Sequence, residues 1–111
     1  MKRYCLALDL KDDPQLIAEY EYWHRAENGW HEVRKSIFDA EITNMQIYRT
    51  GNRLFMIMET SDQYEVEKKA AMDAVNPKVQ EWEQLMWKFQ KPLPWAREGE
   101  KWVMMEQIFQ L

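Results

Sequence analysis

The pattern of apolar and polar residues divides the chain into strand-like and helix-like segments. Residues 3–10 alternate between the two kinds, and this period of two predicts a first strand. A helix is predicted from Pro14, because the Asp13 side chain can accept hydrogen bonds from its first turn and proline suits that turn. Since glycine weakens a helix, we expect this one to falter at Asn28-Gly29, with a second helical piece from Trp30 to about Phe38.

A hairpin is predicted in the middle of the chain. Residues 41–49 and 53–59 are strand-like, and they flank the turn Thr50-Gly51-Asn52. Within the second of these strands, Leu54–Met58 is apolar without a break, so this strand must be covered on both faces of its sheet.

Two more helices and a strand are predicted after the hairpin. Ser61 or Asp62 is expected to cap a helix that runs to Val75, and Asn76-Pro77 restarts it. The restarted helix has an apolar face at helical spacing, made of Val79, Trp82, Met86 and Phe89. The prolines within residues 91–95 predict a rigid connector, and the pattern of residues 101–111 predicts a last strand.

The order strand, helix, strand, strand, helix, strand predicts an α+β fold, the ferredoxin-like split βαβ arrangement with an antiparallel sheet, in a single domain over residues 1–111. The helices suffice to cover one face of that sheet. We therefore expect a homodimer in which two sheets pack face to face.

Charge and composition narrow the choice of partners and compartment. The formal net charge is -4 and there is no basic block, which argues against nucleic acid and against anionic membrane surfaces. No apolar stretch is long enough to span a membrane, and residues 1–4 lead into a strand pattern, unlike a signal peptide. The single cysteine, Cys5, cannot form an internal disulfide, so we expect a structural thiol and a cytoplasmic location.

The first helix carries the candidate site. On a period of 3.6 residues, Tyr20 and His24 lie one turn apart on the same face, so a phenol and an imidazole point into the same space. A plain structural interpretation stays open, in which Tyr20 packs in the core and His24 satisfies a neighbouring carbonyl. A metal site is weakly supported, because His24 with Glu21 or Glu27 lacks a second histidine on that face.

Motifs along almost the whole chain resemble the L-rhamnose mutarotase family, small dimeric α/β barrel proteins that interconvert the anomers of a 6-deoxy-L-hexose. Each motif is short, but they occur together and in order. The residues that carry the resemblance are Tyr20 with His24, Trp30, Asn44–Tyr48, Asn52–Phe55, Gln80–Trp82 and Ile108–Leu111.

The resemblance implies that His24 is a proton donor and that Tyr20 and Trp82 contact the sugar. The chain departs from the family pattern at substrate contacts, with Met45 in place of a frequent tyrosine and Glu83 in place of the second member of a Trp-Trp pair. The turn between His24 and Trp30 is also longer. The substrate is therefore expected to be L-rhamnose or L-fucose, with Met45 and Glu83 among its contacts.

Mutarotation suits these residue types and needs no cofactor. The pyranose opens when a proton reaches the ring oxygen and another leaves the anomeric hydroxyl. An imidazole, whose ordinary pKa is about 6.5, can donate and accept these protons near neutral pH. Trp82 offers a flat apolar face to the sugar. The base partner stays open among Asp9, Glu59, Tyr20 and a bound water.

Two other functions compete with this interpretation. The fold alone would admit a cofactor-free monooxygenase of the same dimeric barrel, with His24 and tryptophans acting on a polycyclic or quinol substrate. A sugar-binding or purely structural dimer would use His24 without catalysis.

Overall fold

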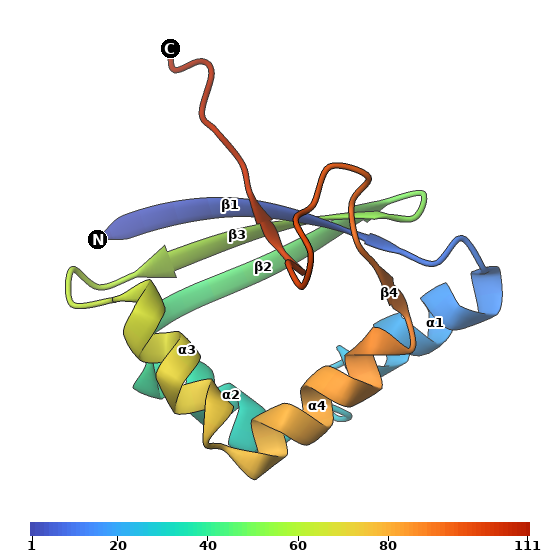
Figure 1. The fold of residues 1–111 in the computed structure, drawn as a ribbon, viewed down its shortest axis with the longest axis horizontal. Coiled ribbons are helices and arrows are strands. Elements are labelled where there is room, and N and C mark those ends of the chain that lie inside the picture. The colour runs from blue at the N-terminus through green and yellow to red at the C-terminus, as the bar shows by residue number, and fades with distance from the viewer.

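All strands lie in one antiparallel sheet, and the helices cover one of its two faces (Figure 1). The computed structural model describes residues 1–111. Its elements are β1 (Lys2–Leu10), α1 (Pro14–Trp23), α2 (His31–Asp39), β2 (Ile42–Thr50), β3 (Arg53–Thr60), α3 (Val66–Ala74), α4 (Pro77–Trp87), β4 (Gln90–Lys91) and β5 (Val103–Met104). The strand order β2-β3-β1-β4 is that of the ferredoxin-like arrangement, so the predicted fold class is confirmed.

The register of the strands assigns each side chain to one face of the sheet. Leu6 of β1 lies opposite Met56 of β3, and Met56 lies opposite Ile47 of β2, so these side chains share the face that the helices cover. Their neighbours in sequence point to the other face, which carries no helix; we call it the open face. At its centre are Cys5, Ala7, Tyr48, Phe55 and Ile57.

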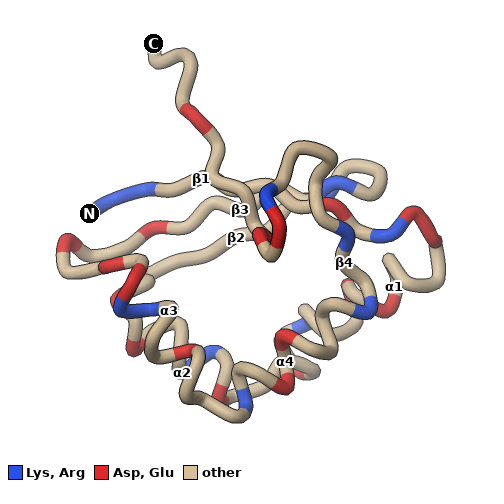
Figure 2. Tube along the Cα trace, in the orientation of Figure 1, with Lys and Arg blue, Asp and Glu red and all other residues tan.

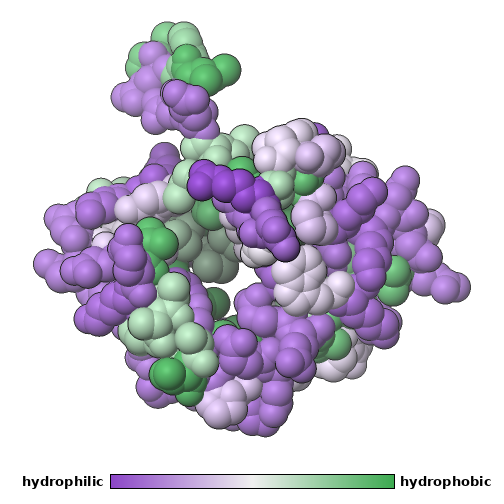
Figure 3. Space-filling view, in the orientation of Figure 1, coloured by the Kyte–Doolittle hydropathy of each residue, from purple (hydrophilic) through white to green (hydrophobic).

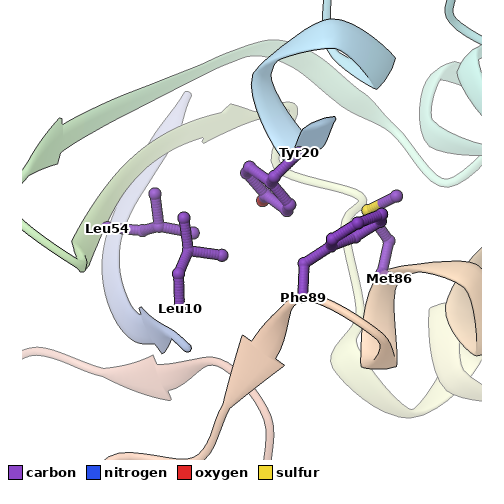
Figure 4. Close-up of a cluster of buried hydrophobic side chains, with 5 residues drawn as sticks. All are labelled: Leu10, Tyr20, Leu54, Met86 and Phe89. Carbon is purple, nitrogen blue, oxygen red and sulfur yellow. The ribbon is translucent and has the colours of Figure 1, made fainter. Parts of the chain in front are cut away.

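The apolar core between the sheet and the helices has two clusters. One contains Leu10, Tyr20, Leu54, Met86 and Phe89, and the other contains Ala40, Ile42, Met56, Met58 and Tyr64. Figure 4 shows the first cluster, in which Tyr20 descends from α1 between the strands and the end of α4. Trp102 packs against both clusters, so the C-terminal segment also helps to close the core.

Three predicted helix starts, at Pro14, near Trp30 and at Pro77, are confirmed and one is wrong. The Asp13 carboxylate accepts hydrogen bonds from the backbone N–H groups of Gln15 and Leu16, and the Asn76 side chain caps α4 in the same way. Neither Ser61 nor Asp62 caps α3, which begins at Val66. Ser61 instead accepts from the Gln63 N–H in a tight turn, and Asp62 pairs with the N-terminal amine.

The predicted last strand is also wrong over most of its length. Only Val103–Met104 pairs with β1, opposite Ala7 and Leu6. Farther along the same edge, β1 pairs with β4, a strand that the sequence did not indicate. Two short strands therefore share the edge of β1, and the connector between them brings the chain from one to the other.

Charged residues surround this framework. Lys, Arg, Asp and Glu are interspersed along the helices and loops, whereas the middle of β1 and β3 is uncharged (Figure 2). No helix is both long and apolar enough to cross a membrane.

The Asp13 cap generates a stability prediction. Asp13→Ala removes the acceptor of two backbone N–H groups, at 2.9 and 3.2 Å, and should lower the free energy of unfolding by about 1 kcal/mol in urea titrations. Asp12→Ala is the matched control, because Asp12 is an exposed acidic neighbour outside the cap, and it should change stability little. Equal effects of the two changes would contradict the capping role.

Candidate active site

A pocket of about 340 Å³ lies between α1 and the edge strand β2. The space-filling view shows that the molecule is hollowed between the sheet and the helices (Figure 3). The pocket is lined by Tyr20, Glu21, His24, Ile47, Tyr48, Arg49 and Leu54. Arg49 donates to the Glu21 carboxylate at 2.6 Å, so an ion pair ties β2 to α1 beside the pocket. The volume is large enough for a monosaccharide.

His24 occupies the C-terminal end of α1, which ends before the predicted Asn28-Gly29. Its ring Nδ1 lies 2.7 Å from the carbonyl oxygen of Tyr20, while its backbone N–H bonds to the Glu21 carbonyl. The ring thus takes the place of the backbone donor that would have continued the helix. Because a carbonyl oxygen can only accept, Nδ1 carries the proton, and in the neutral ring Nε2 is left with a free lone pair.

Aromatic rings surround His24 on two sides. The Tyr20 ring lies 4.1 Å from the His24 ring between centroids, and the Trp82 ring lies 5.6 Å away on α4. Trp30, the N-cap residue of α2, packs edge to face on Trp82 at 5.3 Å. Three separate helices therefore contribute one aromatic wall around the imidazole.

The surroundings of His24 favour its neutral form. One side of the residue stays open to solvent, yet protein atoms crowd the ring, and this burial lowers the pKa of His24 below its ordinary value. The hydrogen bond to the Tyr20 carbonyl opposes the shift and does not cancel it. At neutral pH the Nε2 atom is therefore a proton acceptor.

The Tyr20 hydroxyl is a neutral hydrogen-bonding group. Tyr20 is buried, and burial raises its pKa far above the ordinary value. The hydrogen bond of the Gln90 amide lowers this pKa, and the charge of Glu83 raises it. Tyr20 therefore keeps its proton at physiological pH, so its hydroxyl is not ionised to a phenolate that could serve as the base.

Glu83 and Met45, the two departures from the family pattern, lie in different surroundings. Glu83 pairs with Lys101, whose ammonium also lies 4.6 Å from the centre of the Trp87 ring. Its carboxylate is close enough to affect Tyr20. Met45 packs instead against the second core cluster, away from the cluster that contains Tyr20. The structure thus places Trp82 against His24 and Glu83 near Tyr20, with neither of them in the lining of the pocket, and it places Met45 apart from them.

Asp9 and Glu59, two of the candidate bases, lie on the open face of the sheet. Asp9 accepts two hydrogen bonds from Arg53, at 2.8 and 3.2 Å. Glu59 accepts from Asn44 and Arg3, and these hydrogen bonds, the one from Asn44 most strongly, hold its pKa below the usual range. Because the sheet separates both carboxylates from His24, neither can reach a sugar in the pocket.

Sequence reasoning missed Gln90. Gln90 belongs to β4 and is almost completely buried, and its side-chain oxygen has no hydrogen-bond partner. It stands beside the Tyr20 hydroxyl, where its amide can orient the phenol. A two-residue strand has no detectable periodicity, so no sequence signal could have placed Gln90 here. The structure brings no three His, Cys, Asp or Glu side chains together in a metal-binding group.

Comparison with known proteins identifies the family. Residues 3–111 match the L-rhamnose mutarotase family. An L-fucose mutarotase of Xanthomonas campestris pv. campestris is 49% identical over 111 residues, which are 100% of this chain and 89% of that protein.

Solved structures support the same fold. The crystal structure of an L-rhamnose mutarotase from Formosa agariphila superposes with a TM-score of 0.71 at 18% identity, over 100% of this chain and 99% of the other. Tetracenomycin F2 cyclase of Streptomyces glaucescens, a polyketide cyclase, has the same coverage with a TM-score of 0.61 at 12% identity, so it shares the fold alone. Because its residues 3–111 match the family and a relative is 49% identical to it, the chain belongs to the L-rhamnose mutarotase family, whose members are isomerases that act on sugars.

Proposed function

We propose that this protein interconverts the α and β pyranose anomers of a 6-deoxy-L-hexose, either L-fucose or L-rhamnose. The observation that carries the proposal is the His24 imidazole, which faces a pocket with Nδ1 bound to a carbonyl and Nε2 free. The name of the 49% identical relative makes L-fucose the first sugar to test.

In the proposed reaction, His24 both accepts and donates a proton. Nε2 takes the proton from the anomeric hydroxyl as the bond between C1 and the ring oxygen breaks, and C1 becomes an aldehyde. The resulting imidazolium gives that proton to the ring oxygen, so no net proton is gained or lost. Because both oxygens are bonded to C1, one nitrogen can serve them in turn. Rotation of the aldehyde followed by the reverse steps gives the other anomer.

The neighbouring residues have supporting roles in this proposal. The Tyr20 hydroxyl donates to a sugar oxygen, and Trp82 covers an apolar face of the ring. Glu83 is assigned as an acceptor for a sugar hydroxyl, held in place by Lys101. Met45 is assigned an indirect role, since it packs in the core behind the site.

The proposal also includes a homodimer in the cytoplasm. Cys5, Phe55 and Ile57 on the open face are only half-buried although they are apolar, and no helix of this chain covers them. A second copy would bury this surface. The free Cys5 thiol suits a reducing compartment.

Substitution of the two pocket residues tests the catalytic roles. His24→Ala should lower the enzyme-catalysed exchange rate of L-fucose by about 100-fold or more, because a methyl group moves no proton. Tyr20→Phe should lower it only about tenfold, the effect of one lost hydrogen bond of roughly 0.5–1.5 kcal/mol. NMR saturation transfer between the anomers measures both rates.

Each variant has a matched control in this chain. His31→Ala changes an exposed histidine at the start of α2, and Tyr22→Phe changes an exposed tyrosine of α1, so both should leave the rate unchanged. A His24→Ala protein that is folded and exchanges anomers at the normal rate would remove His24 from the mechanism. A larger loss with Tyr20→Phe would assign the proton transfer to Tyr20.

The pH dependence follows from the lowered pKa of His24. Below that pKa the Nε2 atom is protonated and cannot take the anomeric proton, so the rate should fall with falling pH, with its midpoint below about 6.5. The measurement is the exchange rate from pH 4.5 to 8 after subtraction of the uncatalysed rate, and His24→Ala should lack the inflection. A rate that instead rises as the pH falls would show that imidazolium is the starting form.

The aromatic wall generates a prediction about substrates. L-galactose differs from L-fucose only by a hydroxyl at C6, and its exchange should be slower, by about tenfold, because an apolar wall leaves that hydroxyl without a partner. D-glucose should also be slower. Equal catalysed rates with L-fucose, L-galactose and D-glucose would contradict selection for a 6-deoxy sugar.

A further inference from the structure

Glu21 and Arg49 are the permanently charged side chains in the lining of the pocket, and the proton transfers of His24 use neither of them. Glu21 lies on α1, one position after Tyr20, and Arg49 lies near the end of β2. The pair therefore spans the two elements between which the pocket lies. Its side chains remain accessible to a ligand, since that of Glu21 is 51% exposed and that of Arg49 is 38% exposed.

The hydrogen bonds of the pair fix Arg49 and leave part of each group free. The Arg49 Nε donates to Oε1 of Glu21 at 2.6 Å, and its Nη1 donates to the Gly51 carbonyl at 2.7 Å. A guanidinium carries donors on all three nitrogens, and a carboxylate accepts at both oxygens. Nη2 of Arg49 and Oε2 of Glu21 therefore have no partner in the protein. A donor held in place and a neighbouring acceptor are available at the wall of the pocket.

A second ion pair of α1 shows how a purely structural tie differs. Glu19 binds Lys88 outside the pocket, and the Lys88 ammonium reaches both carboxylate oxygens of Glu19, at 3.2 and 3.5 Å. The pair in the pocket uses one oxygen of Glu21 and leaves the other free. Because exposed ion pairs contribute little to stability, joining β2 to α1 is a weak reason for this arrangement.

The charges of the pair indicate the class of ligand. The carboxylate and the guanidinium cancel, so the pocket has no excess charge from them that would select an anion or a cation. A hydroxyl group both donates and accepts, and its hydrogen bonds to charged groups are stronger than those to neutral ones. Two adjacent hydroxyls of an uncharged sugar could therefore engage Oε2 and Nη2 at the same time.

The position of the pair relative to His24 indicates which hydroxyls these are. Glu21 and His24 are three residues apart on α1, a spacing that separates the Cβ atoms of helical neighbours by about 5–6 Å. This separation is comparable to the width of a pyranose ring. When C1 lies at the His24 Nε2, the hydroxyls at C3 and C4 lie across the ring, toward the pair. L-fucose and L-rhamnose have opposite configurations at C4, so a contact there distinguishes them.

We propose that Glu21 and Arg49 bind the adjacent hydroxyls at C3 and C4 of the sugar and thereby determine which 6-deoxy-L-hexose the protein accepts. Oε2 of Glu21 accepts from one hydroxyl, and Nη2 of Arg49 donates to the other. This inference rests on the proposed function and adds the residues that select the sugar.

The test combines substitutions in the pair with sugars that lack one hydroxyl. The unchanged protein should exchange the anomers of 3-deoxy- and 4-deoxy-L-fucose about tenfold or more slowly than those of L-fucose, at sugar concentrations below saturation. In Arg49→Met one of these two losses should disappear, and in Glu21→Met the other, because the partner of that hydroxyl is already absent. NMR saturation transfer measures the rates after subtraction of the uncatalysed exchange.

Matched controls separate binding from a structural role. Glu19→Met and Lys88→Met remove the tie of α1 outside the pocket, so both proteins should keep the losses of the unchanged protein. Removal of the C2 hydroxyl, in 2-deoxy-L-fucose, should change the rate by the same factor in every protein. If Arg49→Met and Glu21→Met slow all these sugars by one common factor, the pair is a structural tie and the inference is wrong. Coupling to the C2 hydroxyl alone would also overturn it.

A sugar that cannot open separates failure of this inference from failure of the proposed function. Methyl α-L-fucoside has a blocked anomeric oxygen, so its dissociation constant, measured by calorimetry, reports binding without reaction. Arg49→Met should raise this constant about tenfold, and Lys88→Met should leave it unchanged. That result in a protein that exchanges no anomers would overturn the proposed function alone. Exchange that depends on His24, with glycoside affinity unaffected by either substitution in the pair, would overturn this inference alone.

Discussion

The hydrogen bond from the His24 ring to the Tyr20 carbonyl, 2.7 Å long, is the contact on which the site depends. It ends α1, because the imidazole takes the carbonyl that the next backbone N–H would use. It also selects the tautomer, since Nδ1 must carry the proton, and it leaves Nε2 free. The same geometry holds the imidazole 4.1 Å from the Tyr20 ring. One local contact thus sets the position, orientation and protonation of the proposed catalytic group.

The register of the sheet decides which side chains lie beneath the helices and which lie on the open face. Side chains alternate between the two faces, so a strand shifted by one residue would present its side chains to the opposite face. In the observed register, Leu10 and Leu54 support Tyr20 beneath the helices, while Asp9 and Glu59 form ion pairs on the open face. Asp9 and Glu59 are thereby kept out of the pocket, where the one carboxylate, Glu21, is paired with Arg49 beside the His24 imidazole and the Tyr20 phenol.

The C-terminal third of the chain adds polar groups that the first helix cannot supply. The short strand β4 brings the Gln90 amide to the Tyr20 hydroxyl, and the segment before β5 brings Lys101 to Glu83. Trp102 closes the core next to them.

Short-range patterns in the sequence were sufficient to determine the local structure of several segments of this protein. The Asp13 and Asn76 caps, the central hairpin and the spacing that places Tyr20 and His24 on one face depend on groups within a few residues of each other, so the chain specifies them locally. These local signals, in their order along the chain, also indicated the ferredoxin-like fold.

Tertiary structure decided what depends on segments far apart in the chain. The strand pattern of residues 101–111 predicts that the segment can pair, but in the folded chain β4 takes the edge of β1 at Asp9 and Leu10 and only Val103–Met104 pairs beside it. The pairing of Lys101 with Glu83 and the contact of Gln90 with Tyr20 arise only after packing. The lowered pKa of His24 is likewise a product of packing, because burial by residues from several elements, and not residue type, determines how much water surrounds the ring.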